Sequence, residues 1–144
     1  MITELTPDTT SQELFDYITT FLFKQGKPAM SKDKNCRYRA PEGRMCAVGC
    51  ILPDSIYHRK MENKTVHQLL IFARNNGDTF PITEDGKAYF KALEPHLNLL
   101  DALQSAHDHA GYDFSRITKK AVHALWDREF SEIAQRFNLK YEPK

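Results

Sequence analysis

The N-terminal part of this 144-residue chain carries both a start and a stop signal for a helix. Thr10 and Glu13 have the spacing of a capping box, in which each side chain binds the other residue's backbone amide. Gly26 suits the left-handed position after a helix, and Pro28 prevents continuation. These signals predict a helix over residues 11–25, which must bury an apolar stripe against partner elements. The stripe consists of Leu14, Phe15, Ile18, Phe21 and Leu22.

Helical periodicity returns in the second half of the chain. The predicted helices cover about 64–75, 83–93, a continuation past Pro95 to Gly111, and a final helix from a cap at Ser115 to about Phe137. Pro95 either kinks its helix or opens a new one at the first helical position. Trp126, Phe130 and Phe137 recur at helical spacing, which is typical of core packing.

The segment that follows Gly26 has a different pattern. Residues 36–39 and 44–46 flank the tetrapeptide Ala-Pro-Glu-Gly, where the Pro and the Gly fit a tight turn. We therefore predict a small β-hairpin over about 36–46, inserted after the first helix. Residues 47–52 either complete its second strand or begin a short helix.

These patterns together predict a mainly α (α+β) fold, with about five helices packed as one domain over residues 1–144. The beginning of the chain lacks the basic and apolar regions of a secretory signal. No run approaches the ~20 apolar residues that span a bilayer. An odd count of three cysteines argues against a disulfide framework. We expect a cytoplasmic protein that does not contact a membrane.

Charge is segregated along the sequence. The formal net charge is only +1, which excludes a uniformly basic nucleic-acid coat. Residues 1–23 carry four acids and no Lys or Arg, residues 24–44 carry seven bases and two acids, and the remainder is balanced. A basic hairpin with an aromatic ring can hold phosphate and stack a base, or it can be a solvated loop. The candidate contact residues are Lys32, Lys34, Arg37, Tyr38, Arg39 and Arg44.

A metal site is the alternative that the cysteines and histidines leave open. Cys36, Cys46 and Cys50 have a spacing that fits zinc only loosely, so we favour packing. A His-Asp dipeptide resembles the motif of the HD phosphohydrolases, helical enzymes that bind divalent metal through a His…His-Asp…Asp set. The residues in matching order are His67, His107, Asp108 and Asp127. Because His107 is in register with an apolar stripe, we favour a core-edge histidine and no cofactor.

Residues 36–57 resemble a segment of small phage and prophage proteins. The shared pattern is Cys-x-Tyr-Arg, a Pro-x-Gly turn, Cys-Ala-x-Gly and Leu-x-Pro-Asp-x-x-Tyr. Residues 103–108 and 126–137 resemble the same proteins. The resemblance implies a phage-encoded protein in the host cell cytoplasm, and it carries no activity with it.

No nucleotide-binding glycine loop, nucleophile elbow or His-Glu-x-x-His motif occurs. We therefore favour a non-enzymatic accessory protein that binds and modulates a host or defence-system protein through the basic hairpin. The alternatives are a nucleotide or nucleic-acid binder using the same residues, and an HD-type phosphohydrolase.

Overall fold

The computed structural model describes residues 6–30, 36–75, 82–111 and 118–143. Its α-helices are α1 (Ser11–Gln25), α2 (Val66–Arg74), α3 (Glu84–Leu93), α4 (Leu97–Gly111) and α5 (Lys119–Arg136). Short 3-10 turns lie at Pro41–Gly43, Gly49–Ile51, Arg59–Met61 and Glu94–His96. The prediction of a mainly helical fold is confirmed.

Helix α1 has the predicted bounds and the predicted caps. The Thr10 hydroxyl accepts a hydrogen bond from the Glu13 amide at 3.1 Å, and the Glu13 carboxylate accepts one from the Thr10 amide at 3.2 Å. Gly26 ends the helix with φ 76°, and its amide donates to the Leu22 carbonyl. The predicted apolar stripe is buried apart from Phe21, which is half-buried.

The later helices form close to their predicted positions. Pro95 lies in the 3-10 turn Glu94–His96, which joins α3 to α4. Helix α5 is capped by Thr118, whose hydroxyl accepts from the Ala121 amide at 3.1 Å. The predicted cap Ser115 lies outside the described residues.

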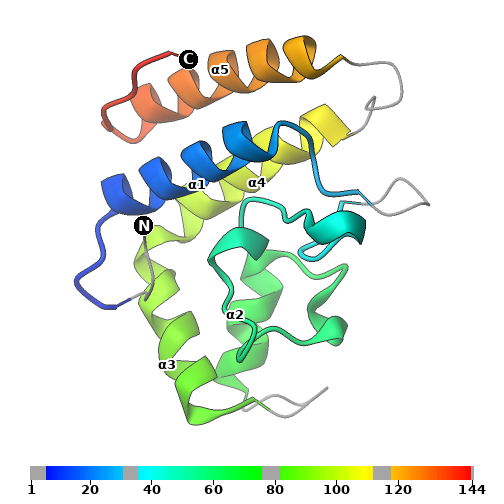
Figure 1. The fold of residues 1–144 in the computed structure, drawn as a ribbon. Helices are drawn as coiled ribbons and strands as arrows, with labels where there is room; N and C mark the ends of the chain where they lie inside the picture. Colours follow the sequence, from blue (N-terminus) through cyan, green and yellow to red (C-terminus); the bar gives the residue numbers. More distant parts are fainter. Residues whose placement is uncertain (1–5, 31–35, 76–81, 112–117, 144) are drawn as a thin grey trace.

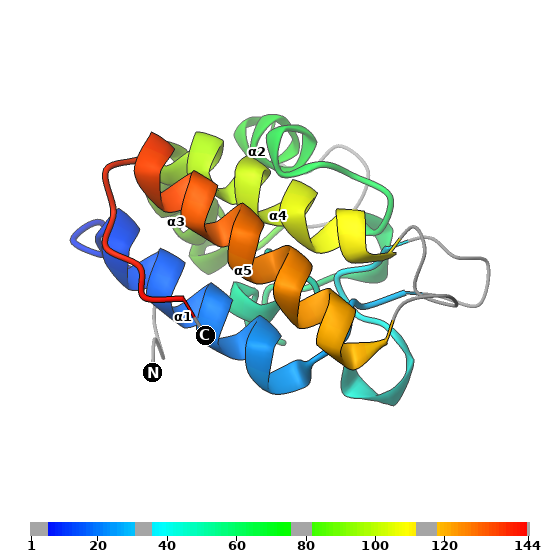
Figure 2. The ribbon, with the colours of Figure 1, turned by 90° about the horizontal axis from the view of Figure 1, so that it is seen from above.

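Helix α4 occupies the centre of the molecule. Helices α1 and α5 lie along one side of it, and α2 and α3 lie on the other (Figure 1). Viewed from above, α1, α5 and α4 run side by side (Figure 2). Phe23 of α1 meets Phe130 of α5 edge to face, with ring centroids 5.5 Å apart. Trp126 is fully buried and donates to the Ala106 carbonyl of α4 at 3.1 Å, so the aromatic stripe of α5 is core.

The predicted β-hairpin over 36–46 is wrong. An isolated antiparallel bridge joins Met30 to Cys36, and no named strand occurs among the described residues. The amides of Tyr38 and Arg39, which would donate to a facing strand, instead donate to the two carboxylate oxygens of Glu62, at 2.9 and 3.1 Å. A strand ladder cannot form where side chains take the backbone's hydrogen bonds.

Residues 47–52 adopt the helical alternative. The Cys50 amide donates to the Cys46 carbonyl at 3.0 Å, and a 3-10 turn follows at Gly49–Ile51. Gly49 packs directly on the backbone of Tyr38. A Cβ atom placed on Gly49 would lie 2.2 Å from the Tyr38 carbonyl oxygen. Glycine is therefore required here by close approach of two backbone segments.

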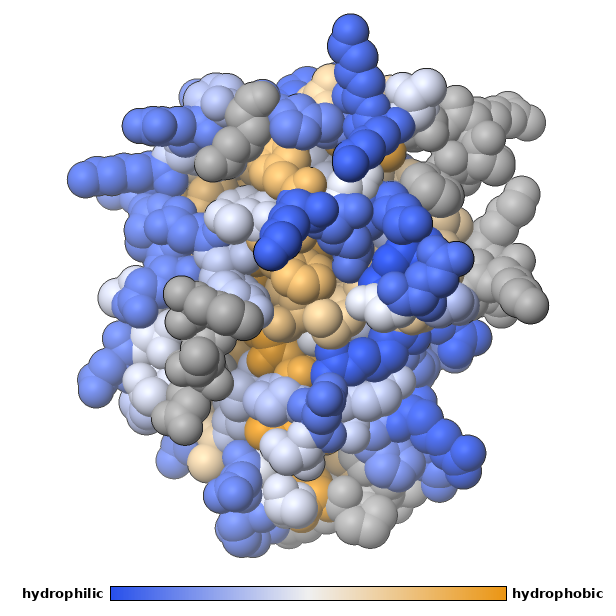
Figure 3. Space-filling view, viewed as in Figure 1, coloured by the Kyte–Doolittle hydropathy of each residue, from blue (hydrophilic) through white to orange (hydrophobic). Residues whose placement is uncertain are grey.

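On the face seen in Figure 1, hydrophobic side chains appear at the surface as a broken strip flanked by hydrophilic ones (Figure 3). Ile71 of α2 is the large apolar side chain most exposed among those described, at 56%. None of the described helices combines the length and the apolar character needed to cross a membrane.

Replacing Gly49 by alanine tests the close approach to Tyr38. We expect Gly49→Ala to lower the free energy of unfolding by about 3 kcal/mol, because the backbone of one segment must move. Gly43→Ala is the matched control, since a Cβ there meets nothing within 4 Å and only the left-handed φ of 73° opposes it. That control should cost about 1 kcal/mol. Equal losses in urea unfolding would contradict the packing described.

Candidate functional site

The last turns of α4 carry a buried polar network centred on Asp108. His107 is fully buried, and its Nε2 accepts a hydrogen bond from the Ala29 amide at 2.9 Å. A backbone amide can only donate, so the imidazole proton resides on Nδ1. Nδ1 lies 2.9 Å from the Asp108 carboxylate and donates to it.

Asp108 accepts one further hydrogen bond. The Gln104 amide donates to the same carboxylate oxygen at 2.8 Å, and the Cys36 thiol lies within 4.8 Å of the carboxylate. The Gln104 carbonyl in turn accepts from the Val48 amide at 3.1 Å. This network therefore joins α4 to the segments that hold Ala29 and Val48.

The network contains the one group of described residues placed to hold a metal ion. Ligand atoms of Cys36, His107 and Asp108 all lie within 4.8 Å of one another. A metal on Nδ1 would force the imidazole proton onto Nε2, where it would face the Ala29 amide hydrogen. The residues present therefore fit a hydrogen-bond network and do not fit a metal centre.

Burial and the neighbouring Asp108 raise the pKa of the Cys36 thiol well above its ordinary value. Burial raises the pKa of Cys46 to about 12. Both thiols are protonated at neutral pH, whereas nucleophilic attack requires a thiolate. These observations agree with the packing role predicted for the cysteines.

The four predicted HD-type residues do not converge. His67 Nε2 lies 3.9 Å from Asp101, on the exposed side of α2 and α4. Asp127 on α5 accepts a hydrogen bond from the Tyr141 hydroxyl at 2.5 Å. Only His107 and Asp108 of the predicted set lie in the group that could share an ion.

Two of the predicted contact arginines are bound to the protein itself. Arg39 donates to the carbonyls of Gly49 and Leu52, at 2.9 and 2.6 Å, and forms an ion pair with Asp54 at 3.0 Å. Its guanidinium also lies over the Tyr57 ring. These donors hold the loop together and are not available to a ligand.

Arg44 is bound in the same way. It donates to three backbone carbonyls, those of Pro41, Pro28 and Met30, at distances between 3.0 and 3.2 Å. All three of its nitrogen atoms thus have a partner within the chain. Arg44 fastens the segment after α1 to the turn at Pro41–Gly43.

The predicted aromatic anchor is part of the core. Tyr38 is only 6% exposed, and its hydroxyl donates to the Lys64 carbonyl. Burial raises the pKa of this phenol. The ring cannot stack on a base or insert into a partner without leaving the core. Lys32 and Lys34 lie outside the described residues.

Arg37 differs from the other two arginines. No hydrogen bond or ion pair joins its guanidinium to any part of the chain that the structure describes, and its Nε is buried without a partner. It lines a cleft of about 280 Å³ between the 36–38 segment, the start of α2 and the exposed side of α4. Lys64 and Thr65 border the same cleft. The Thr-x-x-Gln capping spacing at 65–68 is the signal in the sequence that marks this helix start.

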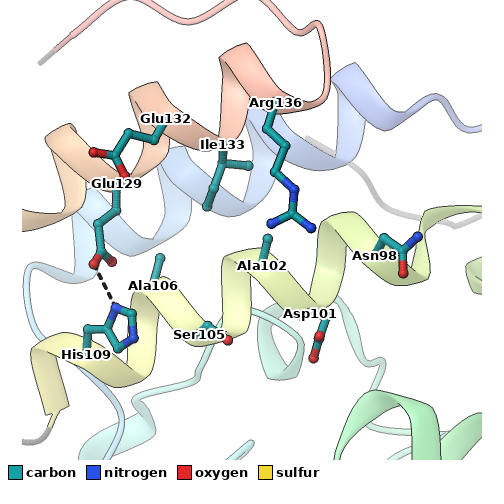
Figure 4. A pocket seen from close by; sticks show the side chains of 10 residues that line it. All are labelled: Asn98, Asp101, Ala102, Ser105, Ala106, His109, Glu129, Glu132, Ile133 and Arg136. Atoms are coloured by element: carbon teal, nitrogen blue, oxygen red, sulfur yellow. Dashed lines mark hydrogen bonds and ion pairs between the residues drawn. The ribbon is translucent and has the colours of Figure 1, made fainter.

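A second depression runs between α4 and α5 (Figure 4). It measures about 330 Å³. Its residues are Asn98, Asp101, Ala102, Ser105, Ala106 and His109 of α4, and Glu129, Glu132, Ile133 and Arg136 of α5. His109 Nδ1 lies 2.7 Å from a Glu129 carboxylate oxygen. We call this depression the α4–α5 groove.

No protein-family model, curated protein or solved structure matches this chain.

The hydrogen-bond interpretation of the Asp108 network predicts indifference to metal. Thermal unfolding of the protein should have the same midpoint with EDTA as with equimolar Zn²⁺, because a ligand that binds the folded state raises that midpoint. Stabilisation by Zn²⁺ that disappears in Cys36→Ser would show that the network rearranges into a metal centre. Cys50→Ser is the control for a thiol outside it.

The raised pKa of Cys46 predicts a loss of stability in alkali. Its thiol loses a proton near pH 9.0 in the unfolded chain and near pH 12 in the folded protein. The stabilising contribution is fully present below pH 9 and is lost as the pH rises toward 12, because only the unfolded state ionises there. The free energy of unfolding in urea, measured from pH 8 to 11, should fall more steeply for the native chain than for Cys46→Ala. Parallel curves would contradict the assignment.

Proposed function

We propose that this chain is a non-enzymatic binding protein whose cleft at Arg37 receives an acidic side chain of a protein partner. The proposal rests on Arg37, whose guanidinium lines a cleft and has no partner among the described residues. Arginine presents a planar fork of donors that matches a carboxylate with two parallel hydrogen bonds. A free fork beside a cleft is thus suited to a carboxylate ligand.

The surroundings of Arg37 favour one carboxylate over a chain of phosphates. Lys64 adds a second positive charge to the cleft, but the acids Glu62, Asp101 and Asp108 also line it. Nucleic-acid sites neutralise several phosphates with a basic stripe. Fewer positive groups than predicted face the surface here, because Arg39 and Arg44 donate hydrogen bonds to carbonyls of the protein itself. A protein partner is therefore the better match.

The non-enzymatic part of the proposal is supported by the state of the reactive groups. Both ring nitrogens of His107 are held in hydrogen bonds, and Cys36 and Cys46 carry raised pKa values. General base catalysis needs a free nitrogen, and nucleophilic catalysis needs a thiolate. The resemblance of residues 36–57 to phage and prophage proteins is the reason to propose a host or defence-system protein as the partner.

An NMR titration tests the cleft with a short blocked peptide that contains one aspartate. We expect the amide signals of residues 36–38 and 62–66 to shift, and Arg37→Gln to weaken binding about tenfold, which is the value of a lost charge-assisted hydrogen bond. Arg128→Gln removes the same charge from an exposed position on α5 and should leave the affinity unchanged.

The same titration distinguishes the alternative partner. Equal affinity in Arg37→Gln, or shifts elsewhere in the chain, would overturn the proposal. A single-stranded oligonucleotide that binds more tightly than the peptide, with log affinity falling steeply against log salt, would replace the protein partner by nucleic acid.

A further inference from the structure

The α4–α5 groove, at about 330 Å³, has room for an extended side chain. Its floor is apolar, and small residues of α4 and one aliphatic residue of α5 form it: Ala102, Ala106 and Ile133. The lining residues of α4 extend from Asn98 to His109, which corresponds to about 16 Å along a helix. A side chain with a long methylene stem can lie on such a floor and keep its charged end in water.

One end of the groove already holds a side chain of this kind. Arg136 extends from α5 toward Ala102, between Ile133 and Asp101 (Figure 4). Its guanidinium lies over the Phe137 ring, 5.0 Å from the ring centroid, so this end of the groove is bordered by a positive charge of the chain itself.

The other end is acidic. Glu129 and Glu132 line it from α5, opposite Ala106 and His109 of α4 (Figure 4). One carboxylate oxygen of Glu129 contacts His109, while the other is buried without a hydrogen-bond partner among the described residues. Leaving a buried charged oxygen unpaired costs free energy, which a cationic ligand would recover. Glu132 is exposed and adds a second negative charge beside it.

We infer that this acidic end of the α4–α5 groove binds an arginine or lysine side chain of the protein partner. The methylene stem would lie on Ala106 and Ile133, and the cationic end would meet Glu132 and then Glu129. Charge complementarity selects the occupant, because Arg136 is the one Lys or Arg among the described lining residues and it fills the opposite end. An anionic or neutral side chain would leave both carboxylates unpaired.

The inference rests on the proposed function, since it takes the partner to be a protein. Asp101 and Ser105 line both the groove and the cleft at Arg37. The two depressions therefore adjoin across the exposed side of α4. A partner segment would then place an acidic side chain at Arg37 and a basic side chain at Glu129 and Glu132, and this order of charges would set its orientation.

The test uses the full chain and a blocked peptide that contains one arginine, compared with the same peptide containing citrulline, which has the same shape and no charge. We expect the arginine peptide to shift the amide signals of residues 102–109 and 129–133. Glu132→Gln should weaken its binding roughly fivefold, the typical effect of one exposed ion pair. Glu142→Gln removes an exposed acid near the C-terminal end and should change nothing.

Glu129→Gln gives a second measurement at the buried carboxylate, and its thermal unfolding midpoint shows whether the fold is retained. Equal binding of the citrulline peptide, or unchanged affinity in Glu132→Gln, would overturn the inference. The aspartate peptide probes the cleft at Arg37 separately, so a groove that fails to bind arginine leaves that result intact. An aspartate peptide that fails while the arginine peptide binds would reject the cleft and retain the groove.

Discussion

The hydrogen bond from the Ala29 amide to His107 is the interaction on which the centre of this protein depends. Helix α4 packs against elements on both sides, so its polar residues near the core must find partners within the protein. That one bond fixes the imidazole tautomer, which in turn directs the Nδ1 proton to Asp108. Asp108 then accepts a hydrogen bond from Gln104, and the loops that hold Ala29 and Val48 are bound to α4.

The same network explains why residues of the types found in metal and catalytic sites form hydrogen bonds within this fold. Histidine, aspartate and cysteine within one cluster are the donors of metal centres and of acid–base sites. Here their atoms are already paired with each other and with a backbone amide. On the surface, the cleft at Arg37 and the α4–α5 groove adjoin at Asp101 and Ser105 of α4.

The sequence predicted what depends on local interactions. Capping at Thr10 and termination at Gly26 gave the bounds of α1, because both act within one helical turn. It failed at the hairpin, since Glu62, more than twenty residues away, takes the amides that a strand would use. Of the predicted contact arginines, Arg37 alone has a guanidinium without a partner among the residues that the structure describes. Charge counts alone cannot distinguish a free guanidinium from one bound to carbonyls.

The sequence by itself determined the helices, the apolar stripes they bury and the segregation of charge, because these are properties of residue order over one or two turns. Only the tertiary structure decided which charged groups are bound within the protein. Arg37, Arg39 and Arg44 have the same side chain and lie close together in the sequence. Their different contacts follow from which backbone carbonyls the folded chain brings within reach of each guanidinium. The cleft beside Arg37 and the groove beside Glu129 likewise exist only once α2, α4 and α5 lie against each other.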